Sequence, residues 1–171
     1  PSTPGVEVFL SDAIESVFRV LHGVAGVLLI TAGEDVTHCW AKRDVLHGGP
    51  PPECPRCCER EPADIVLRQI QAWADVSRRQ TAPFRVLAWN WEWAYWYPDP
   101  HAPIIDRLPE GVELMLDLEF GGMRLWRGRP IPVGEYSLSY VGPGERFVAG
   151  RAYARQRGIP VGNTPKLLDG A

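Results

Sequence analysis

The sequence predicts an α/β fold with a parallel sheet, and three observations support this prediction. Short apolar runs of strand length alternate with longer segments whose apolar residues recur every three or four positions. This alternation implies parallel strands joined by right-handed crossovers. The longest loops follow the strands and not the helices, as in a (β/α) barrel, although a flavodoxin-like sheet also binds ligands at the carboxyl ends of its strands. The pattern alone leaves both folds open.

The first third of the chain predicts a helix, a strand and a long loop. Apolar side chains within residues 6–22 fall near one helical face, and the polar pair before Ala13 can cap a helix that begins there. Residues 27–30 are continuously apolar, as expected for a strand covered on both faces. Residues 33–60 form an inserted loop rich in Cys and Pro, and loops of this length are usually functional or held by additional bonds.

The remaining elements continue the alternation. Residues 62–79 predict the clearest helix, because Pro62 suits the first turn and an apolar stripe repeats at spacings of three and four. The later predicted elements are a strand at 84–90, a short helix at 102–111, a strand at 112–120, a helix at 144–157 and a strand at 159–164. The Gly-, Arg- and Pro-rich segment after residue 120 is predicted to be a loop.

Composition limits the function. The 171 residues suit a single domain covering 1–171, and the chain starts at Pro1 without a signal sequence, so we expect a processed protein or a piece of a longer one. The net charge is −3 with acids and bases interleaved, which argues against a nucleic-acid partner or an anionic membrane surface. No apolar run approaches the ~20 residues that span a bilayer.

Carboxylates occur at the ends of three predicted strands: Glu34 with Asp35, Glu92, and Asp117 with Glu119. In a parallel sheet these ends meet at one rim, and glycoside hydrolysis requires two carboxyl groups flanking the sugar bond. The alternative is that these acids are simply solvated loop residues.

An aromatic cluster is the second signal. Trp89, Trp91 and Trp93 alternate, so their rings share one face if the strand continues through them. Large flat rings with a polar edge suit the apolar faces of sugars. The alternative is an aromatic plug packed between loops.

The inserted loop also contains a candidate metal site. A Cys-x-x-Cys pair lies in the same loop as a His-Cys pair, and Cys58 adds a competing thiol. Disulfides, in an exported protein, or reduced thiols are the alternatives, and of the two compartments we prefer the cytoplasm. The predicted structural zinc site comprises Cys39, Cys54, Cys57 and either His38 or His47.

Four segments, "LLITAGEDVTHC", "CPRC", "VLAWNWEW" and "VELMLDLEFGG", resemble bacterial glycoside hydrolase-like proteins related to family 20, the β-N-acetylhexosaminidases. The resemblance implies a TIM-type (β/α)8 barrel, of which this chain would supply about half, from the fourth to the seventh strand. It also implies that Glu34 is the general acid. Gly33 stands where the family has an Asp that orients the acetamido group, which casts doubt on acetamido-assisted chemistry.

A half barrel exposes two strand edges, so we expect either the missing barrel half or a homo-oligomer partner to close it. The predicted function is a carbohydrate-active domain acting on (N-acetyl)hexosaminides, with no cofactor required for catalysis. The alternatives are a non-catalytic sugar-binding module on a decayed barrel and a zinc-organised interaction domain. The predicted catalytic residues are Glu34, Glu119 and Asp35, and the predicted substrate-binding residues are Trp40, Trp89, Trp91, Glu92, Trp93 and Tyr140.

Overall fold

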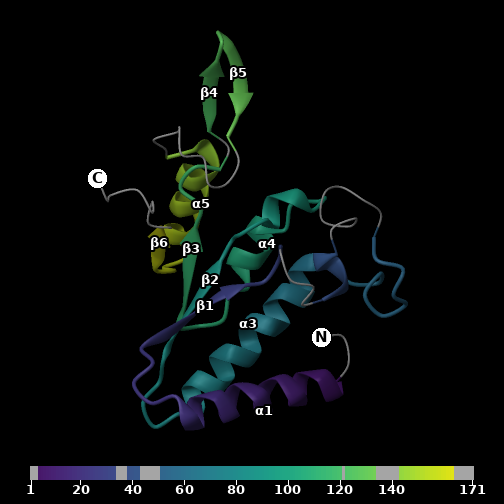
Figure 1. Cartoon of the computed structure of the whole chain (residues 1–171), viewed down its shortest axis with the longest axis vertical. Coiled ribbons are helices and arrows are strands. Elements are labelled where there is room, and N and C mark those ends of the chain that lie inside the picture. Colours follow the sequence, from purple (N-terminus) through teal and green to yellow (C-terminus); the bar gives the residue numbers. More distant parts are fainter. Residues whose placement is uncertain (1–3, 34–37, 43–50, 121, 134–142, 164–171) are drawn as a thin grey trace.

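The computed structural model of the chain describes residues 4–33, 38–42, 51–120, 122–133 and 143–163. Within these residues a four-stranded parallel sheet is covered by helices, and an antiparallel hairpin projects from it (Figure 1). The sheet strands are β1 Gly26–Ile30, β2 Arg85–Trp89, β3 Val112–Leu116 and β6 Val161–Asn163. The α-helices are α1 Pro4–Val20, α3 Pro62–Arg79, α4 His101–Asp106 and α5 Glu145–Gln156. None of the helices that the structure describes has the length and apolar character to cross a bilayer.

The strand order β1-β2-β3-β6 follows the chain without reversal, and all three pairings are parallel. The predicted α/β fold with a parallel sheet is therefore confirmed. A flavodoxin-like sheet reverses its strand order at the point where the ligand binds, and the four described strands have no such reversal. Their order is compatible with successive β/α units, and the four described strands form an open sheet.

One face of the sheet carries the main hydrophobic core. Leu114 of β3, Ile70 of α3 and Ile104 of α4 are completely buried there, because each helix turns its apolar stripe toward the strands. The opposite face is only partly covered: Leu28 and Ile30 of β1 are 45% and 51% exposed.

The predicted element boundaries differ from the observed ones in informative ways. Helix α3 matches its prediction at both ends. Helix α1 begins at Pro4 and not at Ala13, because the apolar spacing extends upstream of Ser11 and Asp12, the pair predicted to cap it. Strand β3 ends at Leu116, four residues earlier than predicted. The predicted loop after residue 120 contains β4 Met123–Trp126 and β5 Arg129–Pro132, an antiparallel hairpin.

Gly144 joins the start of α5 to the loop that follows β3. Its N–H donates to the carbonyl oxygen of Leu118 at 2.7 Å, so this amide is not available to hold an anion. A Cβ at position 144 would lie 2.7 Å from the carbonyl oxygen of Glu119 and would also clash with the backbone of Phe120.

The substitution Gly144→Ala is therefore expected to lower the free energy of unfolding by roughly 1–3 kcal/mol, because backbone atoms must move to admit the methyl group. Urea unfolding measures the effect. Gly5→Ala is the matched control, since no atom lies within 4 Å of a Cβ at position 5. Equal stability of the two variants would contradict the close approach at Gly144.

Candidate functional site

The carboxyl ends of β1, β2 and β3 are joined by hydrogen bonds between buried polar side chains. Trp89 Nε1–H donates to Asp117 Oδ1, and the Asp117 backbone N–H donates to Asn90 Oδ1, both at 2.9 Å. Trp93 Nε1–H donates to Thr31 Oγ1, also at 2.9 Å. These bonds hold together three strand ends that are distant in the sequence. Asn90 and Thr31 were not among the predicted site residues, although each directly follows an apolar run.

Glu92 and Gly33 meet at this rim. Glu92 has φ 58° and ψ 3°, in the left-handed region that few non-glycine residues occupy and that is more common at functional sites. Gly33 has φ 111°, and a Cβ there would lie 2.7 Å from Trp91 Nε1 and 2.9 Å from Glu92 Oε2. Glycine is thus favoured at position 33 for two reasons: its φ is positive, and the loop that follows β2 leaves no room for a Cβ. Glu34 and Asp35, the predicted acids that follow it, lie outside the described residues.

The tryptophans divide between two clusters. Trp89 and Trp91 have ring centroids 4.8 Å apart and pack with Met115, on the partly covered side of the sheet. Trp93 is completely buried in the main core, where its ring lies beside His101. The expected alternation of all three rings on one face is wrong, because β2 ends at Trp89 and a 3₁₀ turn, Trp93–Tyr95, follows.

The other predicted site residues are less closely grouped. Glu119 is half-buried in the loop after β3, and its carbonyl oxygen accepts the N–H of Gly122 at 3.0 Å. Trp40 is 7% exposed and its Nε1–H donates to the carbonyl oxygen of Cys57 at 3.0 Å, which gives it a structural contact. Tyr140 lies outside the described residues.

The thiols of Cys39, Cys54 and Cys57 form a cluster that can hold a metal ion. The three sulfur atoms lie within 4.8 Å of one another, and no disulfide joins the four cysteines. Cys58 is exposed and is not a member of the cluster. Three of the predicted zinc ligands are thus brought together.

The electrostatics of the thiol cluster favour thiolate formation at one member. The backbone N–H groups of Arg56 and Cys57 direct hydrogen bonds at Cys54 and lower the pKa of its thiol to about 7. Burial, followed by hydrogen bonds from Cys57 and Cys54, raises the pKa of Cys39 to about 11. A bound cation replaces the protons that these thiols would otherwise share, because metal ligation requires the thiolate form.

His38 does not belong to this group. Its Nε2 lies 2.8 Å from the carbonyl oxygen of Thr31, and its ring packs near that of Trp96. Burial lowers the pKa of His38 to about 4, which keeps the imidazole neutral. The other predicted imidazole ligand, His47, lies outside the described residues.

The thiol cluster is connected to the strand-end rim through two indoles. Trp40 bonds to the backbone of Cys57, and Trp96 Nε1–H donates to the carbonyl oxygen of Trp40 at 2.9 Å. Trp96 belongs to the loop that leaves β2, a few residues beyond Glu92. Two hydrogen bonds therefore join the thiol cluster to the loop that carries Glu92.

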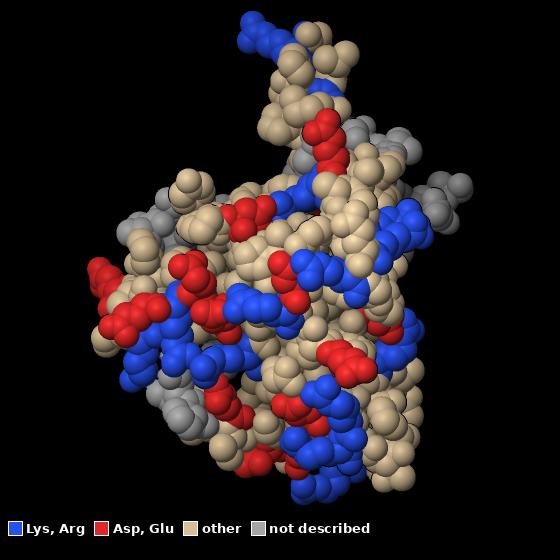
Figure 2. All heavy atoms as spheres, turned by 180° about the vertical axis from the view of Figure 1, so that it is seen from behind, with Lys and Arg blue, Asp and Glu red and all other residues tan. Residues whose placement is uncertain are grey.

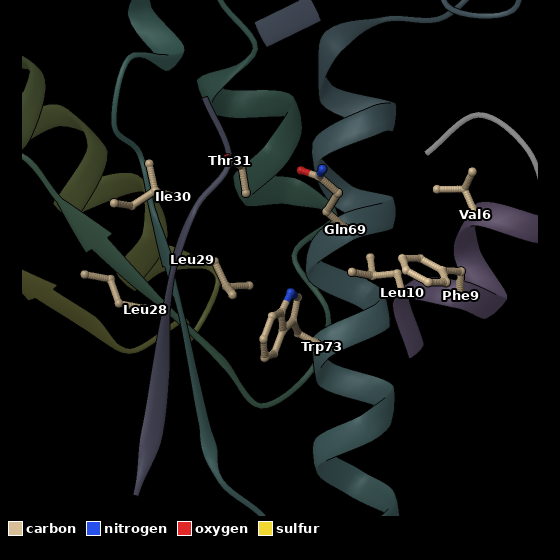
Figure 3. Close-up of a pocket in the computed structure, with 9 residues that line it drawn as sticks. All are labelled: Val6, Phe9, Leu10, Leu28, Leu29, Ile30, Thr31, Gln69 and Trp73. Carbon is tan, nitrogen blue, oxygen red and sulfur yellow. The ribbon is translucent and has the colours of Figure 1, made fainter. Parts of the chain in front are cut away.

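A separate hollow of about 450 Å³ lies between α1, α3 and the free edge of β1 (Figure 3). In Figure 3, Leu29 and Thr31 point toward α3, whereas Leu28 and Ile30 point the opposite way. Among the described residues, those that line this hollow carry no carboxylate, thiol or imidazole. Its lining residues are Val6, Phe9, Leu10, Leu28, Leu29, Ile30, Thr31, Gln69 and Trp73.

Comparisons of this chain with protein-family models, with curated proteins and with solved structures give no match.

Proposed function

We propose that this chain is part of a carbohydrate-active (β/α) barrel that cleaves (N-acetyl)hexosaminides, with Glu34 as the general acid. The supporting observation is the convergence of the ends of β1, β2 and β3 on one hydrogen-bonded rim. Gly33, which precedes Glu34 in the sequence, lies against Glu92 of the neighbouring loop. Parallel α/β folds bind substrates at this end of their sheets.

In this proposal Glu34 donates a proton to the glycosidic oxygen, and Glu119 is the second carboxylate, with Asp35 as a further acid. A nucleophilic Glu119 requires about 5–5.5 Å between the carboxyl groups, and a base requires about 6.5–9.5 Å. Trp91 is the proposed aromatic contact of the sugar, because its indole nitrogen lies beside Gly33, the residue that precedes Glu34.

Hydrolysis of a chromogenic N-acetylglucosaminide tests the proposal. Glu34→Gln is expected to reduce kcat by about 10²–10⁴-fold, since that is the typical contribution of a positioned proton donor. Glu110→Gln, an exposed acid just before β3 at the opposite end of the sheet, is the matched control and should leave the rate unchanged. Equal rates for the Glu34 variant and the parent protein would rule out Glu34 as the acid.

A chain that binds the sugar without hydrolysing it would favour the sugar-binding module on a decayed barrel. The glycine at position 33, in place of the family's Asp, is the observation that favours this second candidate. Retained sugar binding with no turnover separates it from the enzyme.

We further propose that the sheet is extended along β1, by the missing barrel half or by a homo-oligomer partner. An apolar hollow lined by side chains of α1, α3 and β1 lies beside this edge strand. The exposure of Leu28 and Ile30 on the other face of β1 is also what an open half barrel would leave.

The third candidate, a zinc-organised interaction domain, rests on the thiol cluster, and we propose that this cluster holds a structural zinc ion. Zinc–sulfur bonds of about 2.3 Å in a tetrahedron place sulfur atoms about 3.8 Å apart. The three sulfur atoms here all lie within 4.8 Å of one another. A fourth ligand comes from His47 or from solvent. Because the cluster joins the start and the end of the inserted loop, the metal would order that loop in either an enzyme or an interaction domain.

A further inference from the structure

The β4–β5 hairpin projects from the same rim as the candidate site. It follows Glu119 in the chain, and Gly122 and Val133 close its base through a 2.8 Å hydrogen bond. Figure 1 shows the hairpin extending away from the sheet and helices. Most residues of β4 and β5 are exposed.

The two faces of the hairpin differ in chemistry. Pairing of Arg124 with Ile131 and of Trp126 with Arg129 places these four side chains on one face. The opposite face carries the apolar side chains of Met123, Leu125, Pro130 and Pro132. One face is therefore cationic and aromatic, and we call it the Arg/Trp face.

The Arg/Trp face is built around the indole of Trp126, which is 57% exposed. The guanidinium carbons of Arg124 and Arg127 lie 5.8 and 5.7 Å from its ring centroid, within the range of cation–π contacts. A ring that can stack and guanidinium groups that can pair with an anion are thus held together on a short, tight hairpin.

The turn of the hairpin has an unusual residue. Arg127 and Gly128 have φ 49° and φ 77°, the positive values of a type I′ turn, in which Asn, Asp and Gly are strongly preferred. An arginine at this position carries a conformational cost, yet its side chain is the one beside Trp126. This combination indicates that the guanidinium has a role other than forming the turn.

The charge of the hairpin is of one sign. Residues 122–133 contain Arg124, Arg127 and Arg129 and no acid, although the whole chain has a net charge of −3. Figure 2 shows acidic and basic groups interspersed over the body, with basic atoms at the end of the projecting hairpin. A cationic site of this small size can pair with the anionic group of a single unit of a larger ligand.

We propose that the Arg/Trp face binds an acidic sugar unit, with the ring of Trp126 against the sugar and the guanidinium groups on its carboxylate or sulfate. This inference rests on the proposed function and specifies its substrate class as an anionic polysaccharide, whose next units reach the rim. A nucleic acid is disfavoured, because its binding surface is usually a broad basic stripe, whereas the hairpin offers three arginines and acidic and basic groups are interspersed over the body.

The test measures binding of the full chain to polygalacturonate, which carries carboxylates, and to dextran sulfate, with neutral dextran and a single-stranded DNA oligonucleotide for comparison. Arg127→Asn is the informative variant, because asparagine is preferred in the turn and the hairpin should fold at least as well. We expect it to weaken binding to at least one acidic polysaccharide about tenfold, the usual scale for losing a charge-assisted contact. Trp126→Ala should weaken the same binding, and Leu125→Ala, on the apolar face and 74% exposed, is the matched control.

Selective binding of an acidic polysaccharide that is lost in Arg127→Asn and kept in Leu125→Ala supports the proposal. Absence of binding to both acidic polymers overturns it, as do equal losses in the two variants or tighter binding of DNA. Cleavage of a small N-acetylglucosaminide is measured separately, because such a substrate is too small to reach the hairpin from the rim. Failure of the hairpin site can therefore be distinguished from failure of the proposed enzyme.

Discussion

Removal of the proposed zinc ion is expected to lower the thermal midpoint of this protein by roughly 10 °C. A ligand present at about 1,000 times its Kd stabilises the folded state by about 4 kcal/mol, and each kcal/mol shifts the midpoint of a domain of this size by about 2–4 °C. Cys39, Cys54 and Cys57 are the expected ligands, and the buried Cys57 is bonded through its carbonyl oxygen to Trp40. Differential scanning calorimetry before and after treatment with a chelator measures the shift, and elemental analysis measures the zinc content.

Two variants make this experiment specific. Cys57→Ser should purify without zinc and show no change in midpoint on chelation. Cys58→Ser removes the neighbouring thiol, which is exposed and outside the cluster, so it should retain both the metal and the shift. A parent protein that purifies without metal and shows no response to added zinc would contradict the structural zinc site.

Acidification from pH 6.5 to pH 4 is expected to remove about 3 kcal/mol of stability through His101 alone. His101 is 8% exposed, and burial, reinforced by the charge of Arg146, lowers its pKa from 6.5 to about 4, while Asp99 opposes the shift. His101 binds a proton near pH 6.5 in the unfolded chain but only near pH 4 in the folded chain. The contribution of neutral His101 to the free energy of unfolding is therefore fully present above pH 6.5 and is lost as the pH falls toward 4. Urea unfolding at a series of pH values gives this profile.

The variant His101→Phe separates this titration from other acid effects. It removes the proton-binding group and keeps a ring of similar shape between Trp93 and Gly150, the latter so close that a Cβ there would lie 2.7 Å from His101 Cε1. The variant's stability should change less between pH 6.5 and pH 4 than that of the parent protein, whatever its stability at neutral pH. Identical slopes for the two proteins would show that His101 does not titrate as described.

Local spacing made parts of the fold and of the candidate site predictable. Helix α3 depends on an apolar stripe that repeats along its own eighteen residues, so its bounds follow from nearby sequence. The Cys-x-x-Cys spacing likewise predicted that Cys54 and Cys57 would face one another, because the short turn between them leaves little conformational choice. The alternation of strands and helices predicted parallel pairing, because a helix between two strands brings the chain back to the same end of the sheet.

Side-chain placement at the rim depended on contacts between distant segments. Trp93 was expected beside Trp89 and Trp91, but β2 ends early and Trp93 turns into the core to bond Thr31, which lies 62 residues away in the chain. His38 was one of two histidines expected as the fourth zinc ligand, but it is not in the thiol cluster, and its Nε2 lies 2.8 Å from the carbonyl oxygen of Thr31.

The sequence by itself determined the alternation of strands and helices, the helix at 62–79 and the grouping of the thiols, because these depend on residues that are near one another in the chain. Only the tertiary structure decided which indoles are buried, which ligand candidate is excluded and where the β4–β5 hairpin projects. Burial and hydrogen bonding between strand ends are set by the packing of the whole sheet, and a local pattern contains no information about that packing.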